Sequence, residues 1–308
     1  MTTVVAVVVT FGPDLELTGT LLRSLSAQVE HVVVVDNGSP DVTGLRDLCA
    51  RADVRFEPLA TNTGIAAAQN VGIAAARDLA ATHVLLSDQD SVPAADMVEL
   101  LLAGLRAAER RGDRPGAVGP VSVDVRSADE VMVYRDSRWG PRRSPCTPDT
   151  DGLVEATFLL ASGCLIPLDV LDDVGGMNEA WFIDHVDLEW GLRARRRGWT
   201  LHAVVAARLD HRLGDRLVRL PGRRQEVHVH SPTRVYYLAR NTVLLVRSGL
   251  LPVAWRIGYL VWLAKLTAFN ALLVPPRWRR ARLAVRGVLD GLLRRTGPLR
   301  VRPGTGSP

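Results

Sequence analysis

Two almost uninterrupted runs of β-branched residues most strongly constrain the fold of this 308-residue chain. Residues 3–10 are Thr-Val-Val-Ala-Val-Val-Val-Thr, and residues 31–35 are His-Val-Val-Val-Val. Strands that are apolar at nearly every position are typically buried on both faces, as in a parallel sheet. Between them, residues 15–28 carry leucines at helical spacing. The pattern therefore predicts a strand, a helix and a second, parallel strand.

The same alternation continues along the chain. Residues 54–56 predict a weaker third strand, residues 65–81 an alanine-rich helix, and residues 84–87 a fourth strand. Residues 181–198 predict a later helix with acidic residues at its start and basic residues at its end, an order that complements the helix dipole. Alternating strands and helices predict a doubly wound α/β layer, in which ligands bind beyond the carboxyl ends of the strands.

Three polar turns follow the predicted strands, at residues 10–12, 36–39 and 87–90. We expect these turns to form one pocket because the carboxyl ends of parallel strands meet at one edge of the sheet. Asp88 and Asp90 supply hard oxygen ligands of the kind that Mg²⁺ or Mn²⁺ prefers. An acidic pair in a turn is also common in solvated loops. No Gly-x-Gly-x-x-Gly follows the first strand, which makes a dehydrogenase a weak interpretation.

Several side chains near these turns are candidates for nucleotide binding. Asp36 can accept hydrogen bonds from a nucleoside, although Asp-Asn-Gly-Ser is also an ordinary turn sequence. The helix after Gly64 begins with small residues, which either admit a nucleotide or pack closely on the sheet. Asn70 is a candidate to orient the nucleotide. A guanidinium such as that of Arg240 matches phosphate oxygens, but a solvated arginine edge explains it equally well.

A second acidic cluster lies in Trp-Phe-Ile-Asp-His-Val-Asp-Leu-Glu-Trp at residues 181–190. On a helix, Asp184 and Asp187 would share one face. Apolar surroundings and mutual repulsion raise a carboxylate pKa, which suits a general base. The alternative is acidic decoration of a helix N-terminus. His211, usually a structural residue when alone, becomes a candidate additional metal ligand.

Composition limits the compartment and the partners. Cys49, Cys146 and Cys164 are scattered, which argues against a disulfide framework and fits a reducing cytoplasm. The apolar N-terminus lacks the features of a signal peptide, so we expect a cytoplasmic protein. The formal net charge is +5, yet no nucleic-acid-binding motif accompanies it. We expect no nucleic-acid partner.

The order of these motifs over residues 3–245 resembles that of inverting family-2 glycosyltransferases of GT-A fold. Residues 87–91 and the segment 182–190 followed by Leu192-Arg193-Ala194 look like the bacterial rhamnosyltransferase branch. Two positions depart from the family. Phe11-Gly12-Pro13 stands where an Asn is common, and Asp184-His185 stands where many members have Glu-Asp. The second departure leaves the base open between Asp184 and Asp187, with Asp184 preferred.

The resemblance implies a metal-dependent inverting transfer from a nucleotide sugar, with dTDP-L-rhamnose the favoured donor and a UDP- or GDP-sugar the alternative. Asp36 would recognise the nucleobase, Asp88 the ribose or the metal, and Asp90 the metal. His211 and Arg240 would support the departing diphosphate. A non-catalytic nucleotide-sugar-binding or membrane scaffold is the alternative from another class. The implied nucleotide-sugar set is Thr10, Phe11, Asp36, Asn37, Gly64, Asn70, Asp88 and Arg240, with Asp88, Asp90 and His211 for Mg²⁺ or Mn²⁺.

The domain organisation expected is a GT-A catalytic domain at 1–245, with a nucleotide-sugar half at about 1–120 and an acceptor half at about 121–245. Residues 246–296 form a C-terminal helical extension, and residues 297–308 a disordered tail. Residues 250–274 are apolar and aromatic but carry Arg256 and Lys265, which favours an interfacial helix over a membrane span. The arginines at 277, 279, 280, 282 and 286 would favour anionic lipid at the inner face of the plasma membrane. The alternatives are packing on the catalytic domain or a homodimer. The acceptor expected is a glycan or polyprenyl-linked sugar.

Overall fold

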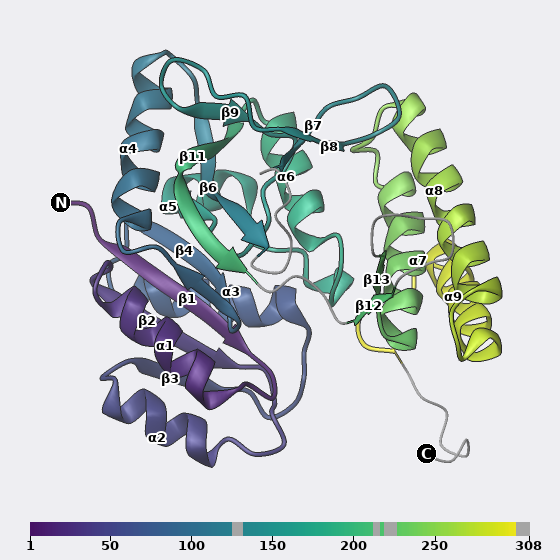
Figure 1. Ribbon diagram of the computed structural model, residues 1–308, viewed down its shortest axis with the longest axis horizontal. Helices are drawn as coiled ribbons and strands as arrows, with labels where there is room; N and C mark the ends of the chain where they lie inside the picture. The colour runs from purple at the N-terminus through teal and green to yellow at the C-terminus, as the bar shows by residue number, and fades with distance from the viewer. Residues whose placement is uncertain (125–131, 212–215, 219–226, 300–308) are drawn as a thin grey trace.

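The first two strands of the chain pair with each other in the parallel half of a large central sheet (Figure 1). This computed structural model describes residues 1–124, 132–211, 216–218 and 227–299. The strands are β1 (Val4–Thr10), β2 (His31–Asp36), β3 (Arg55–Pro58), β4 (His83–Asp88), β5 (Ser91–Pro93), β6 (Pro115–Asp124), β7 (Met132–Arg135), β8 (Arg142–Pro145), β9 (Leu153–Glu155), β10 (Leu165–Pro167), β11 (Thr200–His211), β12 (Arg216–Val218) and β13 (Val227–Val229). The helices are α1 (Leu15–Ser26), α2 (Thr43–Arg51), α3 (Ile65–Asp78), α4 (Met97–Arg110), α5 (Leu168–Val174), α6 (Val186–Arg196), α7 (Pro232–Arg247), α8 (Val253–Leu272) and α9 (Arg277–Leu292), with a 3₁₀ turn η1 at Glu179–Trp181.

The central sheet runs in the order β3-β2-β1-β4-β10-β6-β11-β5, and β9 also pairs with β11. β3, β2, β1 and β4 are mutually parallel, whereas β10 runs antiparallel to both β4 and β6. β5 is antiparallel to β11. The predicted α/β fold with a mostly parallel sheet flanked by helices is confirmed. The apolar runs indicated this parallel half, because β1 and β2 are buried on both faces.

Alternate residues of β1 supply the cores on the two faces of the sheet. Val5, Val7 and Val9 pack in the cluster that includes α3, α5 and α6. Val4, Ala6 and Val8 pack in the cluster that includes α1, α2 and α4. This division follows from the two-residue period of a strand, which points successive side chains to opposite faces.

The alanine-rich helix α3 lies very close to the sheet. A Cβ at Gly72 would lie 2.1 Å from a methyl carbon of Val7, so only glycine allows this separation. Of the two interpretations of the small residues in α3, close packing on the sheet is therefore observed.

The chain ends in three helices at one side of the sheet, where α7 packs against α8 and α9 (Figure 1). In the described part of the chain, none of the helices combines the length and the apolar character that a membrane crossing requires. Residues 300–308 of the expected tail lie outside the described residues. Within residues 297–299, Gly297 O accepts a hydrogen bond from Arg240, and Leu299 N donates to Tyr237 Oη.

One expected helix begins later than its sequence pattern indicates. Helix α6 starts at Val186, and residues 181–185 form a 3₁₀ turn and a loop. Phe182, Asp184 and His185 have φ angles of 63°, 67° and 62°, which right-handed helix does not allow. Asp184 and Asp187 therefore do not share a helix face, because only Asp187 belongs to the helix.

Candidate active site

The carboxyl ends of β1 and β2 are joined by side-chain hydrogen bonds around Asp36. Thr10 and Asp36 are register partners, and Thr10 Oγ1 donates to Asp36 Oδ1 at 3.0 Å. Ser39 adds its backbone N–H at 2.9 Å and its hydroxyl at 2.6 Å. Both Thr10 and Asp36 are fully buried. The carboxylate of Asp36 thus fixes the shape of the β2 turn, and Thr10 acts through it.

All three polar turns meet at this edge of the sheet. The backbone N–H of Phe11 donates to Gln89 Oε1 at 2.7 Å, which connects the β1 turn to the β4 turn. The N–H of Gly12 donates to Ser39 Oγ at 2.8 Å, which connects it to the β2 turn. The ring of Phe11 is half exposed above them. The expected meeting of residues 10–12, 36–39 and 87–90 is therefore observed.

Asn37 and Gly64 link this edge to the start of α3. Asn37 Oδ1 accepts the N–H of Thr63 at 2.9 Å. Gly64 has φ +93°, and a Cβ there would lie 2.5 Å from Phe182 O. The N–H of Ile65 donates to that same oxygen at 2.7 Å. Gly64 therefore lets the loop at residues 182–185, here called the acidic loop, approach the start of α3.

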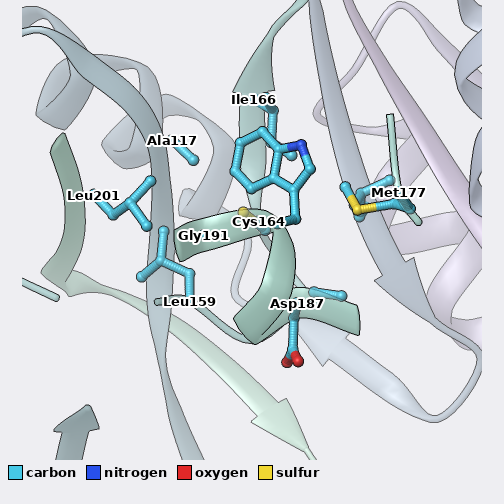
Figure 2. A pocket seen from close by; sticks show the side chains of 11 residues that line it. Ala117, Leu159, Cys164, Ile166, Met177, Asp187, Gly191 and Leu201 are labelled. Atoms are coloured by element: carbon cyan, nitrogen blue, oxygen red, sulfur yellow. The ribbon is translucent and has the colours of Figure 1, made fainter. Parts of the chain in front are cut away.

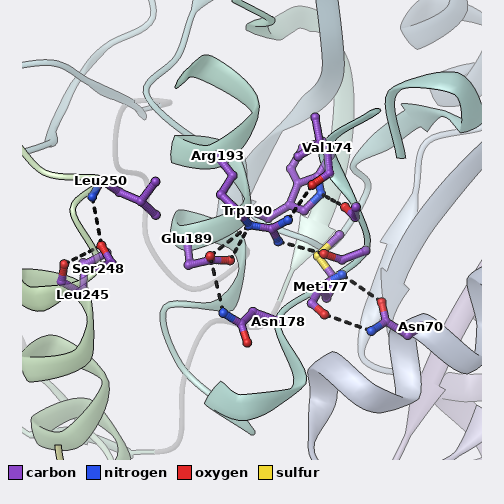
Figure 3. Close-up of polar contacts among 12 residues, drawn as sticks. Asn70, Val174, Met177, Asn178, Glu189, Trp190, Arg193, Leu245, Ser248 and Leu250 are labelled. Carbon is purple, nitrogen blue, oxygen red and sulfur yellow. Dashed lines mark hydrogen bonds and ion pairs between the residues drawn. The ribbon is translucent and has the colours of Figure 1, made fainter. Parts of the chain in front are cut away.

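Asn70 lies farther along α3 and contacts protein groups (Figure 3). Its amide donates to Met177 O at 2.9 Å and accepts from Met177 N at 2.8 Å. From the other side, Arg193 donates to Val174 O at 2.8 Å and Gly176 O at 2.7 Å. These bonds hold the segment before η1 between α3 and α6. The structure does not bring Asn70 to the sheet edge.

Asp88 and Asp90 occupy the turn between β4 and β5. Asp88 is the last residue of β4, and its N–H donates to Ser162 Oγ at 3.3 Å. Both carboxylates are partly buried. His211 ends β11, and its backbone is the register partner of Ser91, directly after Asp90. The β5–β11 pairing thus places the His211 backbone beside the acidic turn, while its side chain lies outside what the structure describes.

The second acidic cluster faces the first. The pKa of Asp187 is raised from 3.8 to about 6, chiefly by burial and further by the negative charges of Asp88 and Asp184. Asp187 Oδ1 accepts the N–H of Leu188 at 2.8 Å. Two acidic segments almost one hundred residues apart in sequence are therefore electrostatic neighbours. Ordinary carboxylates titrate lower, so Asp187 has the proton affinity expected of a general base.

Asp184 has a different environment. Arg234 Nη2 donates to Asp184 Oδ1 at 2.6 Å, and the Asp184 side chain is only 6% exposed. Its other oxygen, Oδ2, is buried without a hydrogen-bond partner among the described residues. The ion pair therefore occupies one of the two carboxylate oxygens of Asp184.

A small apolar cavity lies behind Asp187 (Figure 2). It is lined by Leu86, Ala117, Leu159, Ala161, Cys164, Ile166, Met177, Asp187, Trp190, Gly191 and Leu201. Asp187 is the one ionisable carboxylate of this lining, and Figure 2 shows its carboxylate pointing away from the apolar side chains. The apolar wall behind the carboxylate is a physical source of its desolvation.

Arg240 lies on the far side of the acidic loop and is fully buried. Its guanidinium donates to Trp181 O at 2.9 Å, to Asn241 Oδ1 at 3.0 Å and to Gly297 O. It also lies over the rings of Tyr236 and Tyr237. These contacts direct Arg240 toward the protein interior, and the structure does not bring it to the edge that carries Asp36 and Asp88.

A divalent cation fits the residues at this edge. In the part of the chain that is described, no three metal-ligating side chains are already clustered as a complete site. However, Asp88 and Asp184 disfavour the charged form of Asp187, and a cation would relieve this repulsion. The available donors are carboxylate oxygens, which Mg²⁺ and Mn²⁺ prefer.

Sequence reasoning missed the roles of Arg234 and Asn241. Asn241 donates to three backbone carbonyls of the acidic loop, and Arg234 pairs with Asp184. The sequence did contain one indication of the role of Asn241. Residues 240–242 are Arg-Asn-Thr within an otherwise apolar helical stretch, and polar residues on a buried helix face require hydrogen-bond partners.

Solved structures share this architecture. The chain superposes on *S. aureus* TarS 1-349 in complex with UDP-GlcNAc with a TM-score of 0.58 at 16% identity, covering 94% of this chain and 81% of that one. GalNAc-T7 with UDP, GalNAc and Mn²⁺ gives a TM-score of 0.57 at 14% identity, covering 95% and 56%. These similarities and the observed sheet define the class of fold, which is GT-A-like.

Sequence comparison specifies the family. Residues 6–116 match the family described as Glycosyl transferase family 2. The dTDP-rhamnosyl transferase RfbF of *Shigella flexneri* is 30% identical over 258 residues, covering 83% of this chain and 84% of that protein. The N-acetylglucosaminyl-diphospho-decaprenol L-rhamnosyltransferase of *Mycobacterium tuberculosis* is 27% identical over 271 residues, covering 78% and 84%. The chain belongs to glycosyltransferase family 2.

Proposed function

We propose that this enzyme transfers L-rhamnose from dTDP-L-rhamnose, with inversion, to a hydroxyl of a lipid-linked glycan. The observation that carries the proposal is the electrostatic interaction between Asp187 and Asp88, because we assign Asp187 as the base and Asp88 to the diphosphate side of one site. Relatives whose names specify rhamnosyl transfer support the choice of sugar. The decaprenyl diphosphate acceptor in one relative's name supports the choice of acceptor class.

The donor would bind across the three turns. The exposed ring of Phe11 offers a stacking surface for the base, and the turn shaped by Asp36 and Asn37 offers backbone groups to the nucleoside. Asp88 and Asp90, with His211 at the end of β11, would hold a divalent cation. When bound, such a cation neutralises the diphosphate leaving group as a Lewis acid.

Asp187 is the better candidate for the general base. Its pKa of about 6 lets it be ionised at neutral pH and still accept a proton effectively. Asp184 was preferred from the sequence, but its ion pair with Arg234 holds one oxygen. In the proposed step, Asp187 takes the acceptor hydroxyl proton while that oxygen attacks the anomeric carbon. The bond to the diphosphate breaks on the opposite face, so one displacement inverts the configuration.

A panel of nucleotide sugars tests this function. The purified enzyme is incubated with dTDP-L-rhamnose, UDP-sugars or GDP-sugars, Mg²⁺ or Mn²⁺, and a synthetic N-acetylglucosaminyl-diphospho-prenol acceptor. We expect glycan product only from dTDP-L-rhamnose, and we expect Asp90→Ala to reduce it at least about 100-fold. Asp172→Asn is the matched control because Asp172 is exposed and pairs with surface Arg77. Product from a UDP- or GDP-sugar instead, or near-normal turnover by the Asp90 variant, would contradict the proposal.

The C-terminal helices support attachment to an anionic membrane surface. Exposed apolar side chains of α8, α9 and the turn between them are Val253, Ile257, Leu260, Val261, Trp262, Leu272, Leu273, Trp278, Val285, Leu289, Leu292 and Leu293. Arg277, Arg279, Arg282 and Lys265 are exposed among them. Apolar side chains beside cations are typical of interfacial helices.

Two residues predicted for this surface have other roles. Arg280 is buried and donates to Asn270 Oδ1 at 2.9 Å and to His230 O at 2.8 Å. Trp255 is buried and donates to Ser137 O at 2.8 Å. The membrane surface we propose therefore excludes both.

Sedimentation with liposomes tests the attachment. We expect binding to vesicles that contain phosphatidylglycerol, weaker binding at high salt, and loss of binding in Trp278→Glu. A different result would assign this surface to a homodimer. In that case the enzyme would not bind vesicles at low or high salt, and its dimeric mass would become monomeric in Trp278→Glu.

A further inference from the structure

The turn at residues 181–185, which carries Asp184, is held through its backbone by one side chain of α7. Asn241 Nδ2 lies 2.9 Å from Trp181 O, 2.7 Å from Ile183 O and 2.9 Å from Asp184 O. Asn241 is fully buried. A single buried amide thus contacts three of the five carbonyls in the turn.

Arg240 fixes the orientation of that amide. Its Nε donates to Asn241 Oδ1 at 3.0 Å, so the amide nitrogen must face the turn. Its Nη2 donates to Trp181 O at 2.9 Å, which reinforces one of the same carbonyls. Arg240 and Asn241 therefore act together on the start of the turn.

Two further side chains of α7 contact the rest of the turn. The ring of Phe182 stacks on Tyr237 of α7 with centroids 4.9 Å apart. His185 Nε2 lies 3.1 Å from Thr242 Oγ1. Phe182, Asp184 and His185 all have positive φ, a conformation that other residues must impose from outside. The next residue begins α6, whose first turn carries Asp187.

We propose that Asn241, oriented by Arg240, is the positioning residue that holds the strained 181–185 turn and thereby places the acceptor-side carboxylates for transfer. This inference rests on the proposed function of Asp187. Without the amide, the turn would relax toward negative φ, and both the Asp184–Arg234 pair and the start of α6 would shift. Small displacements of a reacting group lower the rate of the chemical step more than they weaken substrate binding.

The test compares Asn241→Ala and Asn241→Asp with the wild type, using dTDP-L-rhamnose and the synthetic prenyl acceptor. We expect kcat to fall about 10- to 100-fold while the donor KM stays within about twofold, because Asn241 does not contact the donor edge. Asn241→Asp has the same size but cannot donate when ionised, so it should be at least as impaired as the alanine variant. Hydrogen exchange should accelerate in the peptide covering residues 179–188.

Asn270→Ala is the matched control. Asn270 is also a buried asparagine that accepts from an arginine and donates to a helix carbonyl, but it belongs to α8 and does not contact the turn. We expect it to lower stability while leaving kcat per folded enzyme unchanged. If Asn241→Ala does not fold, Thr242→Val removes the His185 contact together with a hydrogen bond to Leu238 O within α7. It should give a smaller kcat loss with faster exchange in the same peptide.

Two outcomes would overturn the inference. One is wild-type kcat in both Asn241 variants while Asp187→Asn is inactive, which leaves the proposed function intact. The other is unchanged exchange at residues 179–188 in the Asn241 and Thr242 variants. Normal turnover by Asp187→Asn would instead contradict the proposed function, whatever the Asn241 variants show.

Discussion

At the scale of single residues, two aspartates three positions apart have opposite environments. Asp184 forms an ion pair with Arg234, whereas Asp187 lies against an apolar wall and near other carboxylates. Sequence spacing cannot separate these two residues, because the difference comes from α7 and β4. Burial and nearby negative charge raise the pKa of Asp187, as expected of a general base.

The first prediction concerns activity and stability at Asp187. Asp187→Asn should lower kcat about 100- to 10,000-fold, the range for loss of a general base. The same change should stabilise the fold at pH 7 by at most about 3 kcal/mol, since ionised Asp187 carries the cost of a pKa raised from 3.8 to about 6. Thermal unfolding followed by circular dichroism measures the gain.

The sign of its pH dependence follows from proton binding. Because folding raises the pKa of Asp187, the folded state binds more protons than the unfolded state between pH 3.8 and about 6. The contribution of Asp187 to the stability of the wild type is therefore lost as the pH rises from 3.8 to about 6. The stability difference between Asp187→Asn and wild type should be full above pH 6 and shrink toward pH 4. A constant difference over this range would contradict the raised pKa.

At the scale of elements, the contact between α3 and the acidic loop requires a residue without a Cβ at position 64. Gly64→Ala should destabilise the enzyme by about 1–3 kcal/mol, because the new carbon would meet Phe182 O and strain a positive φ. The shifted loop should also lower kcat. Chemical denaturation and turnover measure the two effects.

Gly152→Ala separates strain from collision. Gly152 also has positive φ, +75°, but a Cβ there would meet no atom within 4 Å. It should cost stability through strain alone and leave kcat unchanged. Equal loss of kcat in both glycine variants would contradict the packing role of Gly64.

The elements also show what the sequence can and cannot reveal. The apolar runs predicted β1 and β2, and the strand ends correctly predicted that residues 10–12, 36–39 and 87–90 meet. The late start of α6 could not be predicted, because Phe182, Asp184 and His185 have positive φ in a turn whose carbonyls contact Asn241, some sixty positions later. Local propensity favoured helix there, and tertiary contacts overrode it.

At the scale of the whole molecule, the helices α7–α9 lie beside the central sheet, whose edge carries the acidic turns (Figure 1). His185 connects the two parts, because its ring lies 6.1 Å from that of Tyr259 and 5.9 Å from that of Trp262 on α8. The exposed apolar surface of α8 thus begins next to the acidic loop. A lipid-linked acceptor bound there would keep its sugar close to Asp187.

This arrangement predicts that membrane binding assists turnover. Anionic vesicles should lower the apparent KM for a prenyl-linked acceptor, and Trp278→Glu should abolish that gain without changing kcat for a short, water-soluble acceptor. Turnover assays with and without vesicles measure both quantities. An equal loss with the soluble acceptor would show that Trp278 supports the fold and not the membrane contact.

The most direct test is the stereochemistry of rhamnosyl transfer by wild type and Asp187→Asn. The product formed from dTDP-L-rhamnose is followed by proton NMR at the anomeric position. Rapid transfer by wild type, with the anomeric configuration opposite to that of the donor, and loss of that transfer in Asp187→Asn are the expected results. Retained configuration, or equal transfer by the variant, would contradict a single displacement assisted by Asp187.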